Sequence, residues 1–127
     1  MRDPIAGWHA YMQAPTTAAL DALLADDVVF QSPAVHTPQR GKAITIKYLA
    51  AAAEVLGGES FRYVGEWRAE RSAVLEFACT LDDGVAVEGV DIIHWDDDGR
   101  IVRFKVMIRP LKALNAVVAR MGAMLAR

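Results

Sequence analysis

Residues 85–110 read VAVEGVDIIHWDDDGRIVRFKVMIRP, two runs of strand-forming residues on either side of a short acidic turn. The runs, at 85–95 and 101–110, are rich in β-branched and aromatic residues. Gly99 closes the turn between them, because glycine adopts a positive φ without steric penalty. The stretch therefore predicts a β-hairpin, and it places one carboxylate, Asp91, among apolar residues of the first strand.

The rest of the chain predicts helices before and after a run of strands. Alternating apolar residues predict four consecutive strands, at 61–70, 73–81, 85–95 and 101–110. Apolar residues three and four apart predict helices at 3–15, 16–27, 43–56 and 111–125. A short strand at 28–33 and a loop at 34–42 are expected between the second and third helices. This order predicts a single α+β domain over residues 1–127, with helices packed on an antiparallel sheet.

Composition limits the classes of function. The chain has 127 residues, of which 54% are hydrophobic and 24% charged, and its net charge is −2. Such a chain lacks the basic surface that binds nucleic acid or anionic membranes. The sequence contains neither a run of roughly 20 apolar residues nor the apolar segment of a signal peptide. With Cys79 as its only cysteine, we expect a cytoplasmic protein that binds neither nucleic acid nor membrane.

The face of the sheet on which Asp91 lies depends on the turn at 82–84. A three-residue loop places Asp91 beside Leu75, on an apolar face. A two-residue loop places it beside Glu76, on a more polar face. Because a slip of one residue moves every side chain to the opposite face, the sequence leaves both registers open.

Both faces of the predicted strand at 85–95 are partly apolar. Ile93 alternates to the same side as Asp91, and Val90 and Ile92 alternate to the other. A solvated sheet face would be polar throughout. We therefore expect one face to cover the interior beneath the helices and the other to meet a second copy of the chain in a homodimer.

The order of elements resembles the nuclear transport factor 2-like superfamily and, within it, SnoaL-like domains. Two stretches carry the resemblance, LDALLADDVVFQSPAVHTPQRGKAI at 20–44 and VDIIHWDDDGRIVRFKVMIRP at 90–110. The resemblance implies a curved antiparallel sheet that wraps around the N-terminal helices to form a cone with an internal pocket, plus a C-terminal helix. The superfamily includes isomerases, cyclases, hydrolases, dehydratases and non-catalytic binding proteins, so the fold alone does not name a reaction.

The ketosteroid isomerase branch of this superfamily implies roles for three positions. Asp91 falls at its hydrogen-bonding acid, Trp8 at its oxyanion-hole tyrosine and Ser32 at its aspartate base. Tryptophan can donate one N–H, but a serine without an adjacent base cannot remove a carbon-bound proton, so only the acid is retained. Polyketide cyclases of the SnoaL type also use a pocket aspartate. An isomerase or cyclase centred on Asp91 is therefore the leading interpretation.

Asp91 and His36 are the candidate catalytic residues. An interior carboxyl with a pKa raised by desolvation can donate or relay a proton, whereas a carboxyl paired with Arg103, Arg109 or a backbone N–H is structural. His36 lies in the predicted loop between prolines, where it is a candidate general base at the pocket mouth or a residue that fixes a turn. Ser32, four residues earlier, lacks the strained turn and the third residue of an activated nucleophile.

The candidate substrate-binding residues combine aromatic or flexible apolar side chains with one serine: Trp8, Tyr11, Met12, Ser32, Trp67 and Met107. We expect them to line a cavity for a small hydrophobic, ring-containing molecule, although the apolar ones also suit an ordinary core. Without HExxH, CxxC or a glycine-rich phosphate loop, the sequence predicts no metal and no cofactor.

Two alternatives to the catalytic pocket remain. The first is a dimeric ligand-binding or assembly module whose cone is filled by Trp8, Trp67 and Met107. The second is an epoxide hydrolase of the limonene type, which needs two aspartates bridged by an arginine around a water. Only Asp91 is placed for such a reaction, so the second ranks last.

Overall fold

The structure, a computed structural model, describes residues 2–127. The helices in this part of the chain are α1 (Pro4–Gln13), α2 (Thr17–Leu23), α3 (Lys42–Leu56) and α4 (Leu111–Leu125). The strands are β1 (Leu24–Gln31), β2 (Gln39–Arg40), β3 (Arg62–Arg68), β4 (Ser72–Thr80), β5 (Ala86–Trp95) and β6 (Ile101–Arg109). The α+β class and the order of the predicted elements are confirmed.

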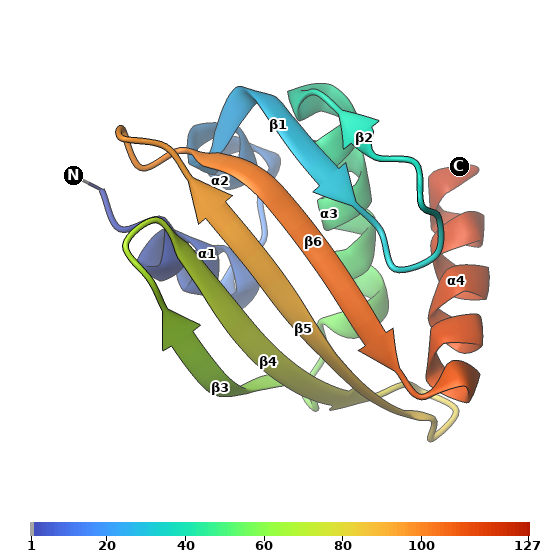
Figure 1. Cartoon of the computed structure of the whole chain (residues 1–127). Helices are drawn as coiled ribbons and strands as arrows, with labels where there is room; N and C mark the ends of the chain where they lie inside the picture. Colours follow the sequence, from blue (N-terminus) through green and yellow to red (C-terminus); the bar gives the residue numbers. More distant parts are fainter. Residues whose placement is uncertain (1) are drawn as a thin grey trace.

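The strands form one curved, open sheet in the order β2-β1-β6-β5-β4-β3 (Figure 1). The predicted meander is confirmed, because each strand from β3 to β6 pairs antiparallel with the next. The expectation of a wholly antiparallel sheet is wrong, since β1 runs parallel to β6. The long segment between these two strands supplies the crossover that parallel pairing requires.

Two local boundaries also differ from the prediction. The second helix ends at Leu23 rather than at residue 27, because Leu24 is already extended, fully buried and paired with Ile101 of β6. Within the predicted loop, Gln39 and Arg40 pair with β1 as a strand of two residues. A strand that short shows no alternation in the sequence.

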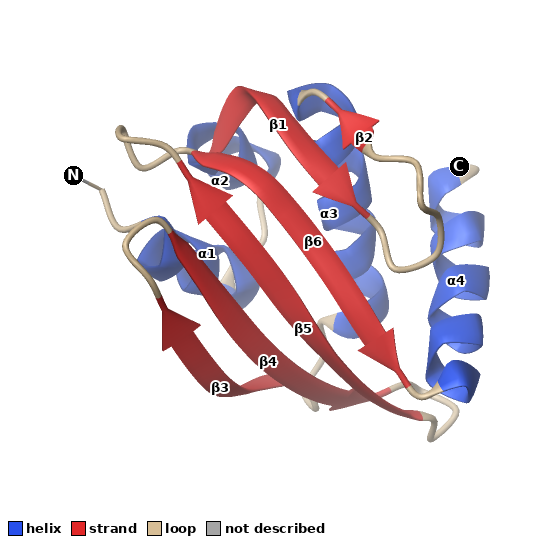
Figure 2. Cartoon of the chain, viewed as in Figure 1, coloured by secondary structure: helices blue, strands red, loops and turns tan. Residues whose placement is uncertain are grey.

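The helices lie on one side of the sheet, with α3 packed against β1 and β2 and beside α4 (Figure 2). Asp3 starts α1 by accepting hydrogen bonds from the backbone N–H groups of Ile5 and Ala6. The C-terminal helix α4 packs against α3 and the ends of β5 and β6. The core between helices and sheet includes the fully buried side chains Ile5, Leu20, Leu75, Phe77 and Phe104. No helix among residues 2–127 has the length and apolar character needed to cross a membrane.

The β4–β5 turn resolves the register that the sequence leaves open. Gly84 has a φ of +87°, and the three-residue form places Asp91 directly opposite Leu75. The second acidic turn has its predicted glycine as well, with Gly99 at a φ of +78°. Asp91 therefore lies on the inner face of the sheet, toward the helices.

A β-bulge in β3 decides which of its side chains face the helices. The register shifts between Tyr63 and Gly65, so that Tyr63 pairs with Phe77 and Glu66 pairs with Leu75. Phe77 and Leu75 belong to the inner face. Tyr63 and Glu66, three residues apart, therefore share this face, whereas a regular strand would direct them to opposite faces.

Candidate functional site

Asp91 is a buried carboxyl with no cationic partner among residues 2–127. Asp91 is 5% exposed. Thr45 is the only other buried residue of the polar or charged type in residues 2–127. The structural alternative of an arginine partner is wrong, because Arg103 pairs with His94 in register on the outer face and Arg109 forms an ion pair with Glu88. Asp91 thus bears the cost of burial without an opposing charge.

Two hydrogen bonds connect three elements at Asp91. The Tyr63 hydroxyl on β3 donates to Asp91 Oδ2 at 2.6 Å. The indole Nε1–H of Trp8 on α1 donates to the Tyr63 oxygen at 2.7 Å. The resemblance placed Trp8 in an oxyanion hole, but its only N–H is already used by Tyr63.

Burial determines how this cluster titrates. Desolvation raises the pKa of Asp91 to about 7, even though the hydrogen bond from Tyr63 acts in the opposite direction. Burial, together with the adjacent Asp91 charge, raises the pKa of the Tyr63 hydroxyl, which therefore stays protonated. Near neutral pH Asp91 exists in both forms. In its neutral form it can accept from Tyr63 on one oxygen and donate an O–H into the adjoining cavity from the other.

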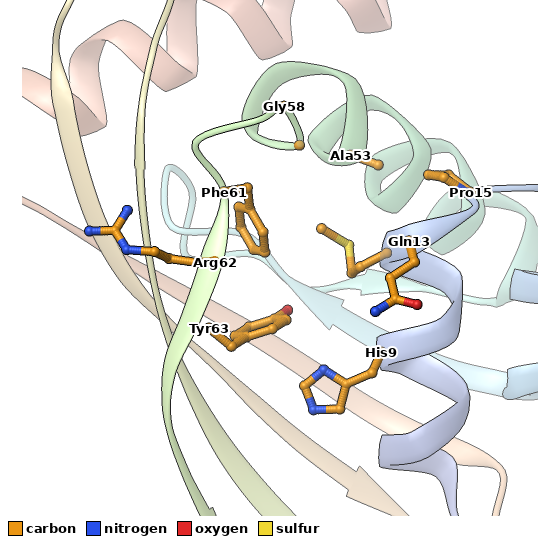
Figure 3. Close-up of a pocket in the computed structure, with 10 residues that line it drawn as sticks. His9, Gln13, Pro15, Ala53, Gly58, Phe61, Arg62 and Tyr63 are labelled. Atoms are coloured by element: carbon orange, nitrogen blue, oxygen red, sulfur yellow. The ribbon is translucent and has the colours of Figure 1, made fainter.

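A small cavity reaches Asp91, and a larger pocket adjoins it. The inner cavity has a volume of about 40 Å³, room for very few atoms, and its walls include Trp8, Met12 and Phe104. The outer pocket has a volume of about 500 Å³ and lies between α1, the end of α3 and β3 (Figure 3). Both volumes are lined by Met12, Ala53, Phe61 and Tyr63. A polar atom of a ligand fits the inner cavity, and a ring fits the outer pocket.

Three predicted substrate-binding residues lie in or beside the Asp91 cluster. Trp8 and Met12 line the inner cavity. Tyr11 is 2% exposed and stacks on Trp8 with ring centroids 5.1 Å apart, so it supports the cavity wall without lining it.

Trp67 and Met107 do not join the site. Trp67 is 59% exposed and pairs in register with Val74 of β4, on the face of the sheet away from the helices. Met107 is 50% exposed on the same outer face, opposite Val90. The expectation that they line or fill the cone is wrong, because their strand positions alternate with those of the inner residues.

Ser32 and His36 lie apart from Asp91. The Ser32 hydroxyl accepts from the backbone N–H groups of Ala34 and Val35, at 3.1 and 3.2 Å, and so stabilises the turn after β1. Ser32 lines a separate apolar pocket of about 180 Å³ beside α4. His36 is exposed in the loop between β1 and β2 and lines neither the inner cavity nor the outer pocket.

Sequence reasoning missed Tyr63 and His9. Tyr63 was part of a predicted strand, but its inward direction relative to Glu66 depends on the bulge, which has no clear sequence signal. His9 lines the outer pocket, and its Nε2 lies 2.9 Å from Glu66 Oε1. No group of three or more His, Cys, Asp or Glu residues within residues 2–127 is arranged to hold a metal ion.

Comparison with known proteins shows the family. The model of the SnoaL-like domain matches residues 5–104, so the chain belongs to this family. A search of curated proteins finds no significant match.

Solved structures of similar fold include a steroid delta-isomerase from Pseudomonas aeruginosa, which is 37% identical over 97% of this chain and 89% of that chain, with a TM-score of 0.90. An uncharacterised protein with a cystatin-like fold from Silicibacter pomeroyi DSS-3 is 29% identical over 97% of this chain and 85% of that one, with a TM-score of 0.87. An NTF2-like protein of unknown function from Mesorhizobium loti shares the fold at 20% identity, covering 84% of this chain and 88% of its own, with a TM-score of 0.72.

Proposed function

We propose that this protein is a cofactor-free isomerase or cyclase that acts on a small hydrophobic, ring-containing molecule, with Asp91 as its acid and base. The observation that carries the proposal is a buried carboxyl that has no cation beside it in the described part of the chain, is hydrogen-bonded to Tyr63 and adjoins a cavity. Such a group is costly for stability and useful for proton transfer. The 37% identity to a steroid delta-isomerase favours a ketone whose double bond moves.

The chemistry suits formation of an enol. A carbonyl oxygen in the inner cavity accepts a hydrogen bond from neutral Asp91 as negative charge develops on that oxygen. The Tyr63 hydroxyl holds Asp91 Oδ2 and so orients the carboxyl. Met12, a flexible side chain that lines both volumes, can adjust its rotamer to admit the ligand.

The test uses 3-cyclohexen-1-one, a one-ring ketone whose conjugated isomer is detected by ultraviolet absorption. The wild-type protein is expected to accelerate isomerisation in proportion to its concentration. Asp91→Asn is expected to lower kcat by roughly 100-fold or more, as is typical for loss of a general acid or base. Equal rates for wild type and Asp91→Asn, or no acceleration by either, would refute the isomerase proposal.

The outer face of the sheet favours a second role, assembly with another copy of the chain. Trp67 and Met107 are exposed there, beside half-buried Val74, Val90 and Ile92. The same face also carries both acidic and basic side chains, which an isologous interface can pair across its two-fold axis: Glu76, Glu88, Arg103, Lys105 and Arg109. We extend the proposal to a homodimer through this face and, because the single thiol is unpaired, to a cytoplasmic location.

Sedimentation velocity at micromolar concentration tests the dimer. Wild type is expected to sediment with twice the chain mass of 13.9 kDa. The double variant Trp67→Glu/Met107→Glu is expected to sediment as a monomer, because buried unpaired charges oppose association. Leu111→Glu, a control on α4 at a side chain that is 71% exposed, is expected to remain dimeric. A monomeric wild type would disprove the interface.

A further inference from the structure

His9 and Glu66 form a carboxylate–imidazole pair at the outer pocket. His9 follows Trp8 on α1, and its ring meets that of Tyr63 edge-on, with centroids 5.2 Å apart. His9 Nε2 and Glu66 Oε1 are 2.9 Å apart. The bulge in β3 brings Glu66 to this face together with Tyr63, so one irregularity positions the partners of both His9 and Asp91.

Glu66 is itself held in place. Arg68 Nε donates to Glu66 Oε2 at 2.7 Å, and Arg68 Nη1 lies 3.2 Å from Asp3 Oδ1. The hydrogen bond from His9, followed by that from Arg68, lowers the pKa of Glu66, which is therefore ionised at neutral pH. An ionised acceptor at Nε2 selects the neutral tautomer with its proton there, which leaves a lone pair on Nδ1.

The Nδ1 atom of His9 is free to act on a ligand. It makes no hydrogen bond to any of the described residues, and Figure 3 shows one nitrogen of the ring turned toward Tyr63 and the pocket. The charged or titratable groups around the ring are Tyr63, Glu66 and Arg68 of β3 and, through Arg68, Asp3 at the start of α1.

The other titratable groups of the two joined volumes cannot remove a proton from carbon while Asp91 acts as acid. These groups are Arg62, Tyr63 and Asp91. Arg62 is a cation and extends away from the pocket (Figure 3). Tyr63 is protonated and donates to Asp91, and Asp91 must carry its own proton to stabilise the carbonyl oxygen.

We infer that His9, oriented by Glu66, is the second acid–base group of this site and removes the carbon-bound proton; the inference rests on the proposed isomerase activity. In the test reaction Nδ1 takes a proton from C2, whose C–H electron pair forms the C1–C2 double bond of a dienol as the carbonyl oxygen receives a proton from Asp91. The imidazolium then returns its proton to C4, the C2–C3 double bond forms, and the oxygen returns its proton to Asp91. No other reactant is consumed.

Steady-state kinetics with 3-cyclohexen-1-one as a function of pH test this role. His9→Gln is expected to lower kcat at least 100-fold with little change in KM. It is also expected to remove the rise of kcat with pH on the acid side of the pH–rate profile. Glu66→Gln, at a positioning residue, is expected to lower kcat about 10-fold and to shift this rise, whereas Glu66→Asp restores part of the rate. Glu70→Gln is the control. Glu70 is exposed and lines neither the inner cavity nor the outer pocket, so this variant is expected to keep wild-type kinetics.

The variants separate this inference from the isomerase proposal. If Asp91→Asn is inactive and His9→Gln retains the wild-type kcat and pH profile, the role of His9 is refuted while the isomerase remains. Nitrogen-15 spectra of the His9 ring give a readout without turnover. The neutral ring is expected to carry its proton on Nε2 in wild type, and a proton on Nδ1 would overturn the inference whether or not the test ketone reacts.

Discussion

Asp91→Asn is expected to raise the thermal midpoint at about pH 8 by several degrees. The carboxyl has a pKa of about 7 in the folded protein and an ordinary value of 3.8, so the folded state binds its proton more tightly. Its contribution to stability is complete below about pH 4 and is lost as pH rises to about 7, which amounts to at most about 4 kcal/mol. Asparagine carries no charge and can still accept a hydrogen bond from Tyr63, so the variant avoids this loss of stability. Its buried NH₂ group needs a hydrogen-bond acceptor, which offsets part of the gain.

The pH dependence distinguishes this explanation from a general effect of the substitution. The difference in midpoint between Asp91→Asn and wild type is expected to grow between about pH 4 and pH 7 and to level off above. Asp27→Asn makes the same change at an exposed carboxyl without an ion pair among the described residues, and as a surface substitution it is expected to leave the midpoint close to that of wild type. A midpoint lowered by several degrees at pH 8 would instead identify Asp91 as a structural partner.

Tyr63→Phe is expected to destabilise the protein by about 3 kcal/mol at pH 8, because it leaves the buried Asp91 carboxylate and the Trp8 N–H without partners. The variant also removes the Tyr63 hydrogen bond that lowers the pKa of Asp91, so this pKa is expected to rise further. The loss of stability should therefore be smaller at pH 5, where Asp91 is neutral. Urea unfolding at both pH values measures the two effects.

Tyr48→Phe provides the matched control for this substitution. Tyr48 is half-buried on α3, and its hydroxyl makes no hydrogen bond to any of the described residues. Its removal is expected to change stability by less than about 1 kcal/mol at either pH. Equal losses in Tyr63→Phe and Tyr48→Phe would contradict the hydrogen-bonded cluster.

The sequence predicts the elements well because their signals are local. Alternation and two glycine turns are enough for the meander, and the turn at 82–84 offers just two registers for Asp91. The parallel pairing of β1 with β6 is not predictable in this way, because it joins segments more than 70 residues apart. The start of β1 at Leu24 likewise depends on burial against β6 rather than on local propensity.

The candidate site is only partly predictable for the same reason. Asp91 is found because the sequence alone shows a charged residue among the apolar residues of a strand. Trp8 is found because the family resemblance aligns it with a functional position. Trp67 and Met107 are misplaced since aromatic and flexible apolar residues look alike on either face of a sheet. The positions of Tyr63 and Glu66 depend on a bulge, and that of His9 on how α1 packs against β3.

The pKa of Asp91 in the folded wild-type protein tests the central claim most directly. It can be measured from the carbon-13 shift of the side-chain carboxyl, with the assignment taken from its absence in Asp91→Asn. A value near 7 is predicted, because the carboxyl is buried and, among the residues that the structure describes, it has no cationic partner and Tyr63 as its single side-chain donor. A value of 4 or below would contradict the account, since Asp91 would then be a stabilised anion unable to donate a proton at neutral pH.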